Sequence, residues 1–327
     1  MKSARRIFIR SIGAWLIGYG FVARAQQAQK AYTIGVLGVA SPSTYALQVE
    51  AFRRGLRDLG YIEGRNVTVE YRWAEGNVAR LPELAAELVR LNPQVLVTSG
   101  PGTAVAKRAT NTIPIVMAVS VNAVESGLIA SLARPGGNVT GSTSFGQELG
   151  VKRLELLKEA FPRLHRVGVL VHSANPANPG ILQAMRDAAQ AFKLQLEVVE
   201  ARSSADFEPA FATLGKTRAE ALVVGDHTIF VAEAARISQL ATVNRLPVIG
   251  FVEIADTGGL LAYGVDFPDL WRRAATFVDK IIKGVKPADL PVERPTKFEL
   301  VVNLKAANNL GITVPQPLRI RADRLIE

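Results

Sequence analysis

The chain of 327 residues contains no cysteine. This absence excludes disulfide bonds, thiolate metal sites and cysteine nucleophiles. It also excludes the acylated cysteine that would tether an exported lipoprotein to a membrane. An exported protein without that tether has to be retained in a closed compartment, and the periplasm of a double-membraned bacterium is one.

Residues and motifs that support catalysis are also scarce. The sequence has three histidines (His165, His172 and His227), and their spacing matches no metal-binding motif such as HExxH. It contains no GxSxG nucleophile elbow and no Walker-type phosphate loop. We therefore expect a protein that is not an enzyme and that holds no metal and no cofactor.

The apolar run near the N-terminus, 12–22, is too short to span a bilayer. It follows several basic residues and precedes Ala23-Arg24-Ala25, which has small residues at the two positions that a signal peptidase reads. This order predicts a signal peptide over residues 1–25, cleaved after Ala25, and a periplasmic protein. The pair Arg5-Arg6 resembles a twin-arginine export signal, with the ordinary secretory route as the alternative.

The formal net charge of +10 overstates the basicity of the mature protein. Five basic residues and no acid leave with the signal peptide, so the charge falls from +10 to +5. No lysine- or arginine-rich run follows, and we expect no nucleic-acid partner. A chain of this length usually forms two domains.

Short β-rich runs alternate with amphipathic stretches of helical period along the mature chain. This alternation predicts an α/β protein with parallel sheets and helices on both faces. Two such series predict two doubly wound lobes, with a crossover at 136–147. Expected strands cover 32–37, 67–71, 94–100, 114–119, 166–171, 194–199, 221–225 and 247–251. Expected helices lie near 47–56, 80–91, from 103, 179–192, 206–214, 230–243 and 270–282. The apolar stripe of the helix at 270–282 does not show which lobe this helix packs on.

Small polar residues and glycines follow the strands of the first series. In open parallel sheets, ligands bind beyond the carboxyl ends of the strands. The loop Ser99-Gly100-Pro101-Gly102-Thr103 predicts a cradle for a carboxylate, because glycines let backbone N–H groups approach an anion. The alternative is that these loops are ordinary turns and helix caps. The ligand-binding residues expected on this lobe are Ser41, Ser99, Gly100, Gly102, Thr103, Ser120, Asn122 and Thr143.

The second series has its own candidates at strand ends. Asp226 follows an apolar strand, where its carboxylate could pair with a ligand ammonium or cap the next helix, and the spacing favours neither role. His172 and His227 also lie near strand ends, although solvated or capping histidines are more common. Single aromatic residues near such loops could line an apolar ligand, but are more often part of the core. The ligand-binding residues expected here are Asn175, Asp226, Phe251 and Tyr263.

Several longer strings occur together in this chain. They are NVTVEYRWAEG (66–76), RLPELAAELV (80–89), TIPIV (112–116), ARPGGNVTG (133–141), KRLELLKE (152–159), a long string at 286–315 and RADRLIE (321–327). As a set they resemble the substrate-binding proteins of the ABC-transporter family that includes tryptophan- and tyrosine-binding members, and the resemblance covers essentially the whole mature chain. It departs from many relatives at Ser120-Val121-Asn122, where they carry an acidic residue.

The resemblance implies a type I periplasmic-binding fold, with two Rossmann-like lobes that are joined by a three-strand hinge and close on a ligand. The implied N-terminal lobe comprises 26–143 and about 265–327, the C-terminal lobe comprises 144–264, and a third crossover falls near 259–266. The expected function is that of a monomeric receptor that delivers a small carboxylate-bearing ligand, such as an amino acid, to an inner-membrane ABC permease. A ligand sensor for a receptor kinase and an enzyme that uses the same cleft are the alternatives.

Overall fold

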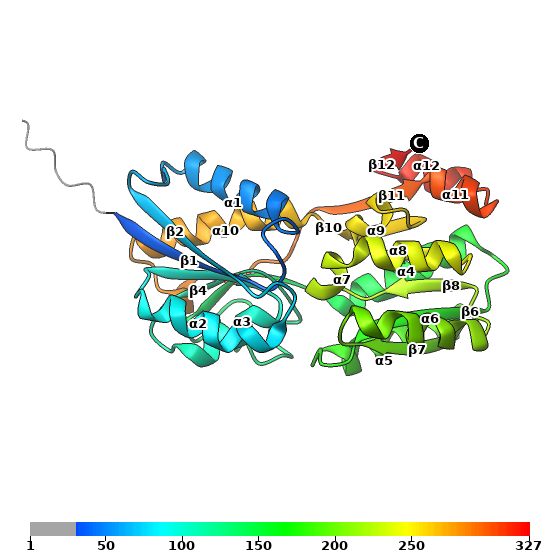
Figure 1. The fold of residues 1–327 in the computed structure, drawn as a ribbon, viewed down its shortest axis with the longest axis horizontal. Helices are drawn as coiled ribbons and strands as arrows, with labels where there is room; N and C mark the ends of the chain where they lie inside the picture. The colour runs from blue at the N-terminus through cyan, green and yellow to red at the C-terminus, as the bar shows by residue number, and fades with distance from the viewer. Residues whose placement is uncertain (1–30) are drawn as a thin grey trace, which may run out of the picture. The chain divides into compact units, whose positions relative to one another are not determined.

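Five parallel strands form the first of two sheets in the computed structural model, which describes residues 31–327 (Figure 1). The predicted signal peptide lies outside the described residues. The strand order is β2-β1-β3-β4-β5, and the central strands β1, β3 and β4 are buried and largely apolar because helices cover both faces of the sheet. The strands are β1 (Tyr32–Gly38), β2 (Val67–Trp73), β3 (Val95–Ser99), β4 (Ile115–Val121) and β5 (Val139–Ser144).

The two faces of this sheet have separate apolar cores. Helices α1 (Ala46–Asp58) and α10 (Phe267–Ile282) pack on each other and on alternate residues of the strands, such as Ile34 and Val36. Helices α2 (Leu81–Arg90) and α3 (Pro101–Ala109) cover the other face, where Leu37 and Leu96 point. Alternation with a period of two therefore sends successive side chains of one strand into different cores.

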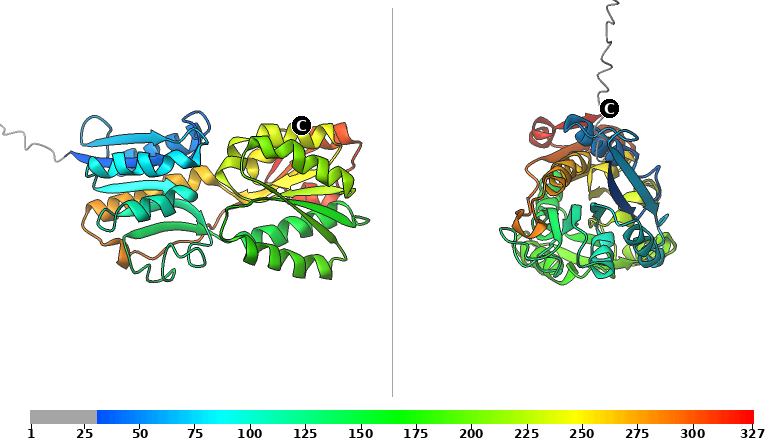
Figure 2. Two further views of the ribbon diagram at one scale, coloured as in Figure 1. Left: turned by 60° about the horizontal axis from the view of Figure 1, so that its bottom comes forward. Right: turned by 90° about the vertical axis from the view of Figure 1, so that its left-hand side faces the viewer.

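Seven strands form the second sheet, in the order β12-β11-β10-β9-β8-β6-β7. Neighbouring strands are parallel except β10 and β11, which are antiparallel. Figure 2 shows that helices cover both faces of each sheet. The strands are β6 (Arg166–His172), β7 (Gln195–Ala201), β8 (Ala221–Val224), β9 (Val248–Gly250), β10 (Leu261–Val265), β11 (Phe298–Asn303) and β12 (Arg324–Ile326).

Helices α4 (Gly146–Ala160) and α5 (Asn178–Ala191) pack together on one face of this second sheet. The opposite face carries α6 (Phe207–Lys216), α7 (Thr228–Ala232), α8 (Ala234–Val243) and α9 (Val252–Asp256). Helices α11 (Leu304–Leu310) and α12 (Gln316–Arg321) join β11 to β12. The helix expected at 230–243 is two helices in the structure, with Glu233 between α7 and α8.

The chain passes between the two sheets three times. The first passage follows β5 into α4, and the second follows β10 into α10. The third begins at Glu293, whose carbonyl accepts a hydrogen bond from the amide of Thr143 in β5, and ends at β11. Residues 259–266 therefore belong to the second passage rather than to the third.

The expectation that the whole of 265–327 belongs to the first lobe is wrong for its last part. Strand β11 pairs with β10 in the second sheet, and β12 pairs with β11. Within 265–327, the contacts with the first sheet come mainly from α10 and from the segment around Leu290 to Glu293. The physical reason is that apolar β11 completes its hydrogen bonds along the open edge of β10. None of the helices within 31–327 is long and apolar enough to cross a membrane.

Candidate functional site

Hydroxyl groups gather at the carboxyl ends of the first-sheet strands. Ser99 Oγ lies 3.1 Å from the hydroxyl oxygen of Tyr45, and Thr103 Oγ1 lies 3.2 Å from Ser120 Oγ. All four residues are buried. Burial raises the pKa of Tyr45 to about 12, so its hydroxyl keeps its proton at neutral pH.

Each of these two hydroxyl pairs has one O–H donor that is not used within the pair. Two hydroxyls that bond to each other use one of their two hydrogens, so each pair has one hydrogen left for another acceptor. Thr98 Oγ1, on the same strand as Ser99, is buried without any hydrogen-bond partner within the described part of the chain. This edge of the first sheet can therefore donate hydrogen bonds to an anionic group such as a carboxylate.

Gly100, which precedes α3, and Gly102, in the first turn of α3, bring this part of the chain close to its neighbours. Gly100 has a φ of +51°, and a β-carbon there would lie 3.0 Å from Cγ2 of Thr228, which belongs to α7 on the second lobe. A β-carbon on Gly102 would clash with Thr98 Oγ1. The absence of side chains at both positions thus permits a close approach between the loop, the sheet edge and α7.

Three other predicted first-lobe residues are engaged within the protein. Ser41 Oγ lies within hydrogen-bonding distance of the Ser43 and Thr44 hydroxyls. Asn122 donates to Gln147 Oε1 at 2.7 Å and accepts from the Gly146 amide at 3.0 Å, which ties β4 to the start of α4. Thr143 donates to the Ser120 carbonyl at 3.0 Å. Asn122 and Thr143 therefore hold the first passage in place, and a contact of either with a ligand stays a prediction.

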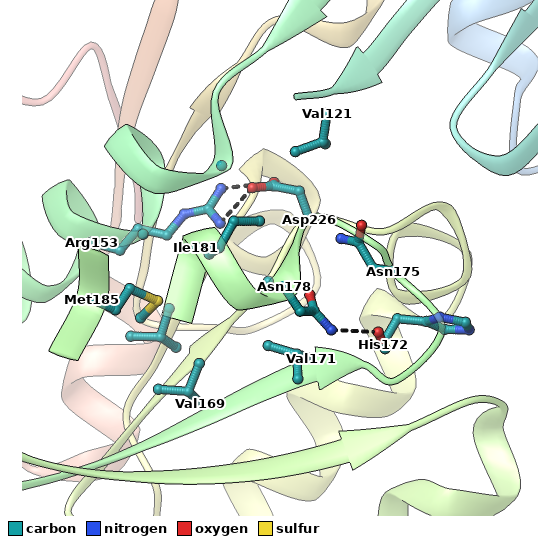
Figure 3. Close-up of a pocket in the computed structure, with 14 residues that line it drawn as sticks. Val121, Arg153, Val169, Val171, His172, Asn175, Asn178, Ile181, Met185 and Asp226 are labelled. Carbon is teal, nitrogen blue, oxygen red and sulfur yellow. Dashed lines mark hydrogen bonds and ion pairs between the residues drawn. The ribbon is translucent and has the colours of Figure 1, made fainter. Parts of the chain in front are cut away.

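A pocket opens at the carboxyl ends of β6 and β8 in the second sheet (Figure 3). Val121 at the end of β4 is the first-lobe residue in its lining. From the second lobe it is lined by polar side chains of Arg153, His172, Asn175, Asn178 and Asp226, and by apolar residues including Val169, Ile181 and Met185.

Arg153 and Asp226 form a bidentate ion pair in this pocket (Figure 3). Arg153 Nη1 and Nη2 each lie 2.9 Å from one carboxylate oxygen of Asp226, and the two side chains are 1% and 12% exposed. The guanidinium also donates to the backbone carbonyls of Val224 and Tyr263. Asp226 is therefore neither a helix cap nor an isolated charge, because its carboxylate is already neutralised by Arg153.

His172 and His227 stack on each other beside this pair. Their ring centroids are 3.7 Å apart and their planes differ by 7°. Each Nδ1 accepts a backbone N–H, from Ala174 and Ile229 respectively. Burial lowers the pKa of His227 to about 3, and the neighbouring His172 contributes to this shift. Burial also lowers the pKa of His172, so both rings are neutral at pH 7.

The remaining predicted second-lobe residues have different surroundings. Asn175 lines the pocket, and its side chain accepts from the Ala177 amide. Phe251 is fully buried among the apolar residues beneath α8 and α9. Tyr263 stacks on Phe298, at a centroid distance of 5.9 Å, in a different surface pocket. The structure thus does not bring Phe251 and Tyr263 to the pocket that holds Asp226.

The comparisons with known proteins cover nearly the whole described chain. Residues 33–326 match the family described as ABC transporter substrate binding protein. The chain belongs to this family. A tyrosine-binding protein of Clostridioides difficile is 27% identical over 305 residues, which are 90% of this chain and 86% of that protein.

Solved structures agree with the two-lobed fold. A conserved domain protein from Vibrio cholerae has a TM-score of 0.85 and 27% identity, and the match covers 90% of this chain and all of that chain (100%). An ABC domain from Streptococcus pneumonia in complex with L-Trp has a TM-score of 0.84 and 24% identity, and covers 91% of this chain and 100% of that one. The fold predicted for this substrate-binding protein, two α/β lobes joined by three segments, is confirmed.

Two charged residues of this substrate-binding protein were missed at the sequence level. Arg153 occupies a buried helix position between Leu149 and Leu157, so an arginine on an otherwise apolar face was the available signal. Glu253 follows β9, and its Oε2 is buried with no hydrogen-bond partner among residues 31–327. Its sequence surroundings, a short apolar run and a glutamate, carry no signal that would distinguish it from a surface residue.

Within residues 31–327, no group of three or more histidine, cysteine or acidic residues could hold a metal ion.

Proposed function

We propose that this substrate-binding protein is an exported periplasmic receptor that delivers a small carboxylate-bearing ligand, an amino acid, to an ABC permease. The lobes would close on the ligand by bending at the three segments that connect the sheets. A ligand that contacts both lobes stabilises the closed state, because only differential affinity can shift such an equilibrium. No chemical step on the ligand is part of this proposal.

The observation that carries the proposal is the pairing of complementary chemistry at the two sheet edges. The first lobe presents hydroxyl donors around Ser99 and Thr103, which suit a carboxylate. The second lobe presents the carboxyl group of Glu253, whose Oε2 has no hydrogen-bond partner within residues 31–327 and which suits an ammonium group. An amino acid carries both groups, so it can bridge the lobes. The tyrosine-binding relative supports the same ligand class.

A thermal-shift screen of the mature protein against amino acids and small carboxylates without an amine tests this proposal. A ligand present at a hundred times its dissociation constant should stabilise the protein by about 2.7 kcal/mol. Binding of amino acids in preference to the matched acids supports the proposed ligand class. A protein that binds carboxylates equally well with and without an amine would contradict it.

The carboxylate cradle has its own test in Thr103→Val. Loss of this hydroxyl should weaken binding about tenfold, because a hydrogen bond to a charged group contributes about 1.5–3 kcal/mol. Thr110→Val is the matched control, since Thr110 lies at the end of α3 and bonds within its own loop. Calorimetry that finds equal affinities for the two variants would remove Thr103 from the site.

A further inference from the structure

Glu253 has one buried carboxylate oxygen without a hydrogen-bond partner and no cation paired with it within the described part of the chain. It lies directly after β9, in the first turn of α9, and the side chain as a whole is half-buried. Its Oε2 atom is fully enclosed and forms no hydrogen bond within the described part of the chain. Burying a charged oxygen without a partner is costly, so such a group either loses its charge or receives a cation.

The charged groups around Glu253 are themselves acidic. Asp256 on the same helix, Asp226 after β8 and Glu299 on β11 all act on it electrostatically. Burial is the main cause that raises the pKa of Glu253 to about 7; a hydrogen bond from its own backbone N–H opposes the shift, and these carboxylates add to it. The nearby cations are engaged elsewhere, because Arg153 binds Asp226 while Arg324 binds Asp256 and Glu299.

The charge of Glu253 is also felt electrostatically by a residue of the first lobe, Tyr45. This charge contributes to the raised pKa of Tyr45, whose hydroxyl bonds to Ser99 at the other sheet edge. Glu253 and Asp226 follow the neighbouring strands β9 and β8, so both carboxylates lie at the same edge of the second sheet. Glu253 Oε2 therefore lies at the edge of the second sheet that faces the hydroxyl groups of the first lobe.

We propose that Glu253 binds the ammonium group of the ligand and releases a proton to solvent when it does so. This inference rests on the proposed function, because it requires an amine-bearing ligand. The protonated carboxyl group of the empty protein and an R–NH₃⁺ ligand give a carboxylate–ammonium pair and one free proton. The arriving cation supplies the partner that the protein lacks, so binding favours the charged form of Glu253.

Calorimetry in buffers of different ionisation enthalpy measures this proton directly. L-Tyrosine and L-tryptophan are the first probes, followed by the other amino acids and small amines. The wild-type protein should release roughly half a proton at pH 7, nearly a whole one at pH 6 and almost none at pH 8.5. Glu253→Gln should abolish this release and weaken binding about tenfold or more. Glu200→Gln, at an exposed position of the same lobe, should do neither.

A second measurement needs no ligand. A carboxyl group whose pKa is raised on folding lowers stability progressively as pH rises from its unfolded value through its folded value. Glu253→Gln removes that loss, so its melting temperature should exceed that of the wild type at pH 8.5. The difference should narrow as pH falls from 7 and should close only below about pH 4.5, where this carboxyl group is protonated in the unfolded chain as well.

The outcomes separate this inference from the proposed function. An amino acid that binds Glu253→Gln as tightly as the wild type, with the same proton release, overturns the inference and leaves the proposed function standing. Melting temperatures of Glu253→Gln and wild type that run parallel from pH 5.5 to 8.5 also overturn it. A wild-type protein that binds no amine-bearing probe overturns the ligand class and the inference together.

Discussion

At the scale of single residues, the ion pair of Arg153 and Asp226 shows that the place of Asp226 in the sequence did not determine the role of its carboxylate. The sequence placed Asp226 at a strand end, where an ammonium partner and a capping role were equally consistent. The structure instead shows two hydrogen bonds of 2.9 Å to a guanidinium that is 1% exposed. The charge of Asp226 therefore stabilises a buried cation before any ligand arrives.

Asp226→Asn should destabilise the protein by about 3–5 kcal/mol, because it leaves the buried guanidinium of Arg153 without its counter-charge. Urea denaturation at pH 7 measures the change. The double variant Arg153→Met/Asp226→Asn should lose less than the sum of the two single variants, since the pair acts as one unit.

Glu155→Gln is the control for this experiment. Its partner Lys152 lies on the same helix, and both side chains of that pair are substantially exposed. Little change in stability is expected there, because water screens exposed ion pairs. If Asp226→Asn were as mild as Glu155→Gln, the buried pair would not contribute to folding.

The stacked histidines give a pH dependence of opposite sign to that of Glu253. His227 has a pKa of about 3 in the folded protein, below its usual 6.5, because burial favours the neutral ring. The unfolded chain therefore binds more protons between these values, and stability falls as pH drops below about 6.5. The loss approaches about 1.4 kcal/mol for each pH unit.

His227→Asn should reduce this acid sensitivity while keeping a side chain that can cap α7. Unfolding free energies at pH 7.5 and pH 5 provide the comparison. His165→Asn removes an exposed histidine and should leave the wild-type pH dependence intact. Equal slopes for His227→Asn and His165→Asn would contradict a buried, neutral His227.

At the scale of elements, the contact between α1 and α10 joins segments more than 200 residues apart. A β-carbon on Gly55 of α1 would lie 2.6 Å from the Arg272 carbonyl oxygen and 2.9 Å from Ala275 Cβ. The two helices can therefore approach closely only because residue 55 has no side chain. Both helices were predicted from their apolar stripes. The partner of α10, however, depended on where the chain returns from the second sheet to the first.

Gly55→Ala should destabilise the protein by about 1–3 kcal/mol, because the added methyl group forces α1 away from the backbone of α10. The same change at Gly215 in α6 meets no atom within 4 Å. Gly215→Ala should therefore raise stability by about 0.5–1 kcal/mol through the better helix propensity of alanine. Denaturant titration distinguishes the opposite signs, and a gain at both positions would refute the close helix contact.

At the scale of the whole molecule, the proposed function requires the two lobes to move relative to each other when a ligand binds. Because the chain has no cysteine, two introduced cysteines are the only thiols available for fluorescent labels. Glu83→Cys on α2 and Lys216→Cys on α6 put one label on each lobe at exposed positions. Energy transfer between them should rise when an amino acid binds.

The matched control puts both labels on the first lobe, at Asp58 and Glu83. Energy transfer in this pair should not change, because a lobe that rotates as a unit keeps its internal distances. A saturating ligand that leaves the interlobe pair unchanged would rule out closure, whereas a change in both pairs would indicate rearrangement within a lobe.

The order of strands and helices was determined by the sequence itself. Hydrophobic periods of two and 3.6 residues are local properties, so most elements from β1 to β9 were predicted within a few residues of their observed bounds. The resemblance of linked strings added the family and the two-lobed fold. The hydroxyl-bearing loops at the first sheet edge were also found this way, since they follow strands whose direction is set by parallel pairing.

Tertiary structure alone decided which sheet the last strands join and which charges meet. Strand β11 pairs antiparallel with β10 because the chain crosses between the lobes a third time, and no local pattern encodes that crossing. Arg153 reaches Asp226 across 73 residues of sequence, and Glu253 is left without a cationic partner because nearby cations are held by other acids. Burial and pairing depend on neighbours brought together by folding, and they determine whether a carboxylate is structural or free for a ligand.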